Sequence, residues 1–225
     1  MAGCTGGGDG GGGDDGDGVD GGGSGGDGGD SDSGEGGDPV ATLCADLTAE
    51  EYAAYDAGET QLIANFDAPS PLVDEFEPSF SGRHEALVDV DRDRSRLRVD
   101  VGCILSAEDQ IDGEPTESEN DPVLSEIEFN GETVPVYGEP EQVKGVVDND
   151  RNRTRQVTAN LPYAVNGTKL YFGTVVFVKL DTSEPIPEDC RERVEPTAVA
   201  IAESLRLNEA NTAEQWINDN WENPP

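Results

Sequence analysis

The chain has 225 residues, with 49 Asp and Glu side chains against 14 Lys and Arg, which gives a formal net charge of −35. This charge excludes nucleic acid as a general partner, because binding to polyphosphate requires a positively charged surface. No apolar run approaches the roughly 20 residues that a transmembrane helix needs. The single histidine and the lack of CxxC spacing among the four cysteines argue against a zinc or iron–sulfur site.

The N-terminal tract, residues 1–38, differs in composition from the rest of the chain. It contains 20 of the 29 glycines and ten of the acidic residues, with no Lys or Arg. Val19 is the one large apolar side chain between Thr5 and Asp38, so the tract lacks the apolar surface that a core requires. We therefore expect a disordered tether over 1–38 and a single globular domain over 39–225.

The acid excess continues through residues 39–225, which carry 39 acidic and 14 basic side chains. Such a charge destabilises a compact domain in dilute buffer, whereas at about 1 M salt the Debye length is only about 3 Å and the repulsion is screened. Arg outnumbers Lys by 11 to 3. The composition resembles that of a haloarchaeal protein, and an acidic secreted protein from a low-salt setting is the alternative.

The start of the chain carries a candidate lipidation site. Met1-Ala2-Gly3-Cys4 is similar to the end of a lipobox, in which small residues precede a cysteine that is lipidated after signal cleavage. The apolar segment that belongs before a lipobox is expected upstream of Met1. Together with the Gly/Asp tract, these residues resemble the anchor and spacer of haloarchaeal cell-surface lipoproteins, most of which have no known function. The resemblance implies a lipid on Cys4 and a location on the extracellular face of the cell membrane.

The three cysteines that follow Cys4 can form one disulfide, and the sequence does not decide which two are paired. With Cys4 lipidated, three cysteines remain, and an extracellular setting permits one disulfide. Cys103 falls on the apolar face of an expected strand, whereas Cys44 and Cys190 each come just before a helix signal. These positions do not select which two of Cys44, Cys103 and Cys190 form the bond.

The domain opens with helix signals and continues with strand signals. Thr48 to Glu51 matches a capping box, and Gly58 is a stop signal, so we expect a short helix between Thr48 and Gly58. Asn130-Gly131 and Asn166-Gly167 are two-residue hairpin turns, which predict antiparallel pairing. The expected strands have β-type composition or alternation and cover Thr60–Phe66, His84–Asp91, Arg96–Leu105, Val123–Phe129, Glu132–Tyr137, Gln142–Asp148, Arg155–Val165 and Thr168–Leu180.

The last strand run and the segment after it complete the expected fold. Thr168–Leu180 is apolar on both faces, so we expect a central strand that is covered on both sides. Pro196 as a first helical residue and an apolar stripe from Ala198 to Leu205 predict a C-terminal helix lying on the sheet. The expected fold class is α+β: a twisted antiparallel sheet built of hairpins, with a short N-terminal helix and a C-terminal helix packed on it. In topology alone this order resembles the PsbP-like sandwich.

An eight-residue segment occurs twice, and the second copy starts 59 residues after the start of the first. Asp89–Arg96 reads DVDRDRSR, and Asp148–Arg155 reads DNDRNRTR, with five identical positions. We expect the two copies at the tips of equivalent hairpins, because each lies between strand runs. The oxygens of Asp89, Asp91 and Asp93 have the alternate spacing of a calcium loop, but arginine stands where that loop requires glycine, which makes calcium a weak candidate.

Arginines dominate both copies of the repeat and the residues next to it. Arginine forks bind carboxylate, sulfate and phosphate, so the tips are candidates for gripping an acidic envelope glycan, an anionic lipid headgroup or an acidic protein. The competing interpretation, which we favour, is that each arginine neutralises the neighbouring Asp residues, because exposed charge clusters usually do no more. The candidate anion-binding residues are Arg92, Arg94, Arg96, Arg98, Arg151, Arg153 and Arg155.

Two acceptor sequons for glycosylation fall in expected turns, at Asn152 and Asn166. No catalytic residue, cofactor or motif such as GxSxG, a P-loop or HExxH can be singled out, and His84 is expected to be a packed histidine. The sequence therefore favours a surface-anchored halophilic lipoprotein that acts as a non-enzymatic binding or interaction module. A small-ligand or lipid carrier with a pocket between sheet and helix is the alternative, and an envelope hydrolase is the third hypothesis.

Overall fold

A computed structural model describes residues 37–58, 64–78, 83–91, 94–107, 122–138, 148–165 and 168–208. Residues 1–36 of the expected tether, including Cys4, lie outside these ranges. The expected strand over 142–147 and the Asn166-Gly167 turn also lie outside them. Among the described residues, no helix is both long enough and apolar enough to cross a membrane.

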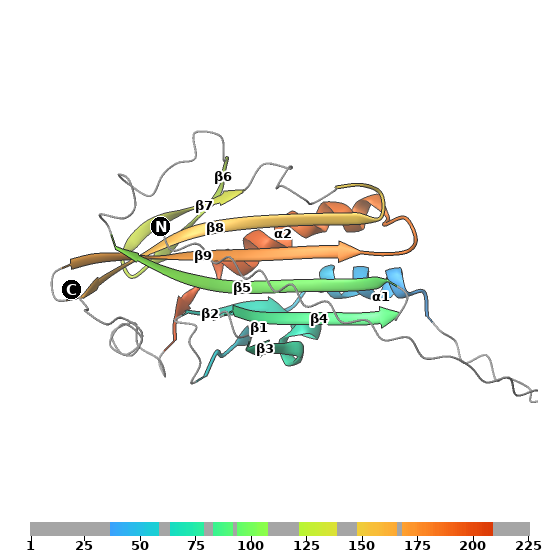
Figure 1. Cartoon of the computed structure of the whole chain (residues 1–225), viewed down its shortest axis with the longest axis horizontal. Helices are drawn as coiled ribbons and strands as arrows, with labels where there is room; N and C mark the ends of the chain where they lie inside the picture. The colour runs from blue at the N-terminus through green and yellow to red at the C-terminus, as the bar shows by residue number, and fades with distance from the viewer. Residues whose placement is uncertain are drawn as a thin grey trace, which may run out of the picture. The chain divides into compact units, whose positions relative to one another are not determined.

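Seven strands form one antiparallel sheet in the order β3-β4-β5-β9-β8-β7-β6 (Figure 1). Its strands are β3 (Phe76–Pro78), β4 (Arg83–Asp91), β5 (Ser95–Ala107), β6 (Val123–Phe129), β7 (Glu132–Gly138), β8 (Asn152–Val165) and β9 (Thr168–Asp181). The expected central place of the last strand run is confirmed, because β9 lies between the other two longest strands, β5 and β8.

A smaller sheet and the helices complete the domain. The smaller sheet has the order β1-β2-β10, and both of its pairings are antiparallel. The remaining elements are α1 (Pro39–Leu47), β1 (Tyr52–Tyr55), β2 (Ala64–Pro69), the 3-10 helix η1 (Ser70–Glu75), α2 (Glu188–Glu203) and β10 (Arg206–Leu207). The expected α+β class, with one helix near the start of the domain and one near its end, is confirmed.

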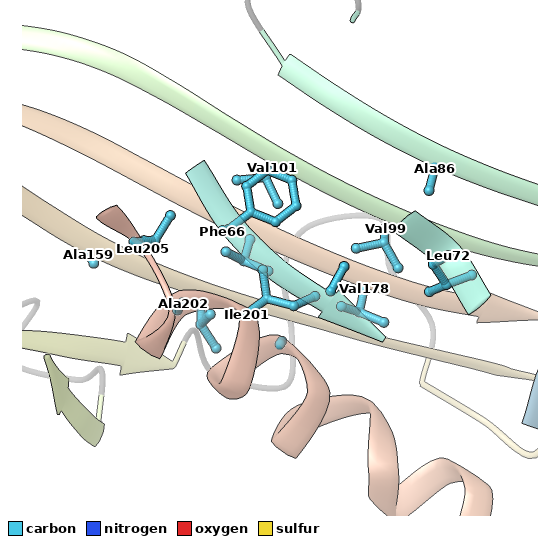
Figure 2. Packing of buried hydrophobic residues seen from close by; sticks show 14 of the residues in the cluster. Phe66, Leu72, Ala86, Val99, Val101, Ala159, Val178, Ile201, Ala202 and Leu205 are labelled. Carbon is cyan, nitrogen blue, oxygen red and sulfur yellow. The ribbon is translucent and has the colours of Figure 1, made fainter. Parts of the chain in front are cut away.

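One hydrophobic core lies between the large sheet and the elements that cover it. Val99 and Val178 point from the sheet toward Phe66 of β2 and Ile201 of α2, and all four side chains are fully buried (Figure 2). Burying a side chain of this size contributes about 1.5 to 3 kcal/mol to stability. This core holds α2 and the small sheet in place. The face of the large sheet that packs on them is called the helix side below. The opposite face, which no described helix or second sheet covers, is called the open face.

The turn between β6 and β7 has the geometry that its sequence predicts. Asn130 and Gly131 both have positive φ angles, of 54° and 84°. A two-residue type I′ turn requires positive φ at both central positions, which Asn and Gly tolerate better than other residues. The turn sets the pairing of Phe129 with Glu132, so the expected hairpin is confirmed.

The first helix lies before the position that its sequence signals indicate. Asp38 is the N-cap residue of α1, where its Oδ1 accepts a hydrogen bond of 3.0 Å from Val40 N, and Thr48 is the C-cap. The predicted helix from Thr48 to Gly58 is therefore wrong. Tyr52–Tyr55 forms β1 instead, because pairing with β2 places Tyr55 within an aromatic cluster.

The second helix begins earlier than expected. Pro196 lies in the interior of α2 and is exposed, whereas the helix starts at Glu188. Proline lacks the N–H of an interior helical hydrogen bond, which makes it a better sign of a helix start than of a helix middle. Acidic residues in the first turn, Glu188 and Asp189, favour the earlier start because they interact with the helix dipole.

A disulfide joins the two helices. Cys44 of α1 and Cys190 of α2 are bonded, with 5.5 Å between their Cα atoms. The bond closes a loop of 146 residues and so links α1 to the start of α2. Cys103 stands outside this bond, on the same face of β5 as Val101, with its Sγ 3.4 Å from Thr174 Oγ1.

Candidate functional site

Both copies of the repeat lie at one end of the large sheet, on the two sides of β9. Arg96 of the first copy and Asn152 of the second pair with the same residue of β9, Asp181. The first copy forms the β4–β5 hairpin, and Asp89 lies opposite Arg96. The second copy forms a tight turn in which Asn149 Oδ1 accepts hydrogen bonds from the backbone N–H groups of Arg151 and Asn152, at 2.8 and 3.0 Å.

The pairing register places the arginines of the two copies on opposite faces of the sheet. Directly paired residues share a face, so Arg96 points to the same side as Asp181. Arg155 pairs with Val178, which belongs to the core. Arg96 and the adjacent Arg98 therefore lie on the open face, and Arg153 and Arg155 lie on the helix side. The expected set of seven does not form one surface among the described residues.

On the open face, Arg96 of the first copy and the adjacent Arg98 are neutralised by carboxylates. Arg96 Nη2 lies 3.3 Å from Asp181 Oδ2. Arg98 Nη2 is 2.8 Å from Asp100 Oδ2, and Arg98 Nε is 3.0 Å from Glu85 Oε1. The hydrogen bond to Asp100 raises the pKa of the Arg98 guanidinium, although burial acts in the opposite direction. Arg98 thereby supplies the charge partner of the almost fully buried Asp100.

On the helix side, the second copy forms a partly buried ion-pair cluster. Asp148 Oδ2 accepts hydrogen bonds from Arg153 and Arg155, the latter at 3.0 Å, and Arg155 Nε is 3.3 Å from Glu195 Oε2 of α2. Arg155 is 5% exposed. The cluster ties the start of β8 to α2, and within the described ranges Asp148 Oδ1 and Arg153 Nε have no hydrogen-bond partner. Buried atoms of this kind are commonly satisfied by an ordered water.

The other candidate residues of the repeat form no defined site among the described residues. Arg94 is exposed and has a φ of 137°, and Arg151 is exposed in its turn. Arg92, Asp93 and the side chain of Asp91 lie outside what the structure describes. Across the described ranges, no three His, Cys, Asp or Glu side chains are placed to hold a metal ion. Asn152 is half-buried at the start of β8, and Asn166 lies outside the described residues.

A shallow pocket of about 310 Å³ lies on the open face beside the central strand. Val175 and Phe177 of β9 form part of its lining, so this face of the strand is half-buried rather than covered as expected. Gly102 faces Val175 on one side and Arg83 on the other. The residues around the pocket are Arg83, Arg98, Asp100, Gly102, Gln156, Val175 and Phe177.

Arg83 lies across the backbone of Gly102 because that position has no side chain. A Cβ on Gly102 would come within 2.7 Å of Arg83 Cγ and 3.3 Å of Arg83 Nε. The side chain of Arg83 therefore runs from β4 across β5 toward the pocket. Among the described residues, no carboxylate lies within ion-pair distance of Arg83. Sequence analysis missed this arginine, because only the strand register places it beside Gly102.

His84 lies in an aromatic cluster under the small sheet. It is 1% exposed, and its Nδ1 is 2.8 Å from Tyr55 Oη. Ring centroids of Tyr55, Phe66 and Phe76 are 5.0 to 5.1 Å apart. Burial lowers the pKa of His84 to about 4. A neutral, fully buried imidazole fits the expected packed histidine and not a group that meets a substrate.

Comparison with protein-family models, with curated proteins and with solved structures finds no match. The geometry of the open face and of the ion-pair cluster is therefore the basis for the function proposed below.

Proposed function

We propose that the protein is a surface-anchored lipoprotein of a halophile and acts as a non-enzymatic binding module at the cell envelope. Its binding surface is the open face of the large sheet around Arg83. The observation that carries this proposal is Arg83, which has no carboxylate partner among the described residues of a chain of net charge −35 and lies across Gly102 beside the apolar residues Val175 and Phe177. An arginine held in this way is available to an anionic partner.

The location part of the proposal rests on two features. Cys4 stands in the lipobox-like start described above. The Cys44–Cys190 disulfide supports an extracellular setting, because disulfides persist mainly in oxidising compartments. A lipid on Cys4 would anchor the domain, and the Gly/Asp tract would separate it from the membrane surface.

The two other hypotheses receive less support from the geometry. A carrier would hold its ligand between the sheet and α2, where Phe66, Val178 and Ile201 are fully buried and pack together (Figure 2). A hydrolase would need a general base within reach of its substrate. His84 is buried and its pKa is about 4, so it does not meet that need.

The anchor is tested by the Cys4→Ser variant, expressed with the native upstream sequence. We expect the unmodified protein to partition into detergent and the variant to be released into the medium, because the lipid is attached through the Cys4 thiol. Mass spectrometry of the intact protein checks that a lipid mass is present. Equal membrane retention of the variant would show that Cys4 is not the anchor.

The binding surface is tested with the lipid-free Cys4→Ser chain and isolated envelope in molar salt. Arg83→Gln should lower association at least about tenfold, because a bidentate charge-assisted contact contributes about 1.5 to 3 kcal/mol. Its free energy of unfolding should change by less than about 0.5 kcal/mol, because the side chain is on the surface.

Arg96→Gln is the matched control, since Arg96 is an exposed arginine on the same face that already pairs with Asp181. It should leave association unchanged. Failure of the lipid-free chain to bind envelope, or equal binding by Arg83→Gln, would reject the open face as the binding surface.

A further inference from the structure

We infer that the open-face pocket binds the carboxylate of an acidic sugar residue, of the hexuronate class, within an envelope glycan. This inference rests on the proposed binding function and names the ligand class of the same site. Three features of the pocket carry it: its size and apolar part, its single uncompensated positive charge, and the hydrogen-bonding amide of Gln156.

The size and floor of the pocket suit one saturated ring. Its volume of about 310 Å³ is near the lower end of ligand pockets, which span about 300 to 1,000 Å³. Phe177 and Val175 offer an apolar surface, and the Arg83 side chain lies beside it, over the backbone of Gly102. One face of a sugar ring carries C–H groups that can pack on such a surface.

The charge of the pocket suits a monoanion. Arg98 is neutralised by Asp100, at 2.8 Å, and by Glu85 beyond the pocket, at 3.0 Å. Among the lining residues this leaves Arg83 as the one positive charge without a carboxylate. A single guanidinium fork matches a carboxylate in charge and in planar geometry, whereas a phosphate monoester carries close to two negative charges.

One remaining polar group, the amide of Gln156, suits a hydroxyl because it can both donate and accept a hydrogen bond. Asp100 is buried, and both of its carboxylate oxygens already accept hydrogen bonds from Arg98 Nε, at 3.1 and 3.0 Å. In the register, Phe177 of β9 lies between Asp100 of β5 and Gln156 of β8, so the amide borders the apolar surface.

The experiment titrates the full lipid-free Cys4→Ser chain in molar salt with four probes. They are a glucuronate oligosaccharide, the matching glucose oligosaccharide, inorganic phosphate and phosphatidylglycerol vesicles. We expect saturable binding of the glucuronate probe that is at least tenfold tighter than binding of any other probe. Arg83→Gln should weaken it at least tenfold, whereas Arg96→Gln should leave it unchanged.

Gly102→Ala is the sharper variant, because it alters the pocket without removing a charge. The added Cβ meets Arg83 Cγ at 2.7 Å, so the Arg83 side chain must move away from the pocket and glucuronate binding should fall at least tenfold. Arg83→Lys keeps the charge but loses the fork, and it should bind more weakly than the unmodified chain. This second variant keeps the test valid if Gly102→Ala folds poorly.

Two kinds of failure are distinguishable. Equal binding of the glucuronate and glucose probes, no binding of either, or tighter binding of phosphate or vesicles would overturn the ligand class. If Arg83-dependent association with envelope persists in that case, the proposed binding function stands with a different ligand. Loss of envelope association altogether would reject both.

Discussion

Reduction of the Cys44–Cys190 disulfide is expected to lower the free energy of unfolding by about 2 to 5 kcal/mol. The bond closes a loop of 146 residues, and the entropy that such a crosslink removes from the unfolded chain corresponds to about 5 kcal/mol at most. Total stabilities of about 5 to 15 kcal/mol make this a large share. Denaturant unfolding in molar salt, with and without reductant, measures the loss.

The double variant Cys44→Ala with Cys190→Ala should reproduce the effect of reductant. Cys103→Ser is the matched control, because Cys103 lies outside the disulfide and its Sγ contacts Thr174 Oγ1, a contact that a hydroxyl can keep. It should change stability by less than about 1 kcal/mol. A reductant effect below about 1 kcal/mol in the unmodified protein would mean that the helices remain docked without their crosslink.

Acidification from pH 6.5 to pH 4 is expected to destabilise the fold through His84. The folded pKa is lowered to about 4, so the unfolded chain takes up a proton near pH 6.5 and the folded domain does not. The contribution of the neutral imidazole is therefore complete above pH 6.5 and is lost as pH falls toward 4. At about 1.4 kcal/mol per pKa unit, the loss approaches about 3 kcal/mol.

The His84→Gln variant separates this effect from the titration of the many carboxylates. It cannot be protonated, and its amide can still meet Tyr55 Oη. Its unfolding free energy should fall less than that of the unmodified chain between pH 6.5 and 4, with the difference approaching about 3 kcal/mol. Parallel pH profiles of the two proteins would show that the imidazole is not held neutral by the aromatic cluster.

The long strands of the large sheet could be predicted from the sequence because their alternating side chains indicate which residues are buried, whereas the short strands β1, β3 and β10 were not predicted. Val99 and Val101 alternate with polar residues on β5, and the apolar runs of β9 mark the strand with neighbours on both sides. Asn130-Gly131 gives the hairpin turn through the same backbone requirement that the structure shows.

Both helix boundaries were misjudged because local signals competed with tertiary contacts. Thr48 has the features of an N-cap, yet the segment after it gains more from pairing Tyr55 into the cluster with Phe66 and His84. Pro196 has the features of a first helical residue, but the turns before it are held by the Cys190 crosslink and by core packing of Val194. Neither contact is visible before the fold is known.

The candidate site also contains residues that the sequence indicates and residues that only the fold brings together. The repeated arginines could be identified from the sequence. In the structure, Arg96 pairs with Asp181 and Arg155 pairs with Asp148, so both arginines neutralise nearby carboxylates. Sequence analysis did not identify Arg83 or Gly102, because neither belongs to a motif. Their importance arises from a cross-strand pairing, which depends on register and not on composition.

The position of the disulfide also determines how the domain would respond to a mechanical pull. If the N-terminal tract is tied to a membrane and the open face holds a glycan, tension enters the domain at α1. Only five residues of α1, 39–43, precede the crosslinked Cys44, so this segment reaches at most about 18 Å when fully extended before the covalent bond to Cys190 takes up the load. The force then passes to α2, whose core contacts spread it over the sheet. A tethered domain built in this way would resist shear at the cell surface without first unravelling from its anchored end.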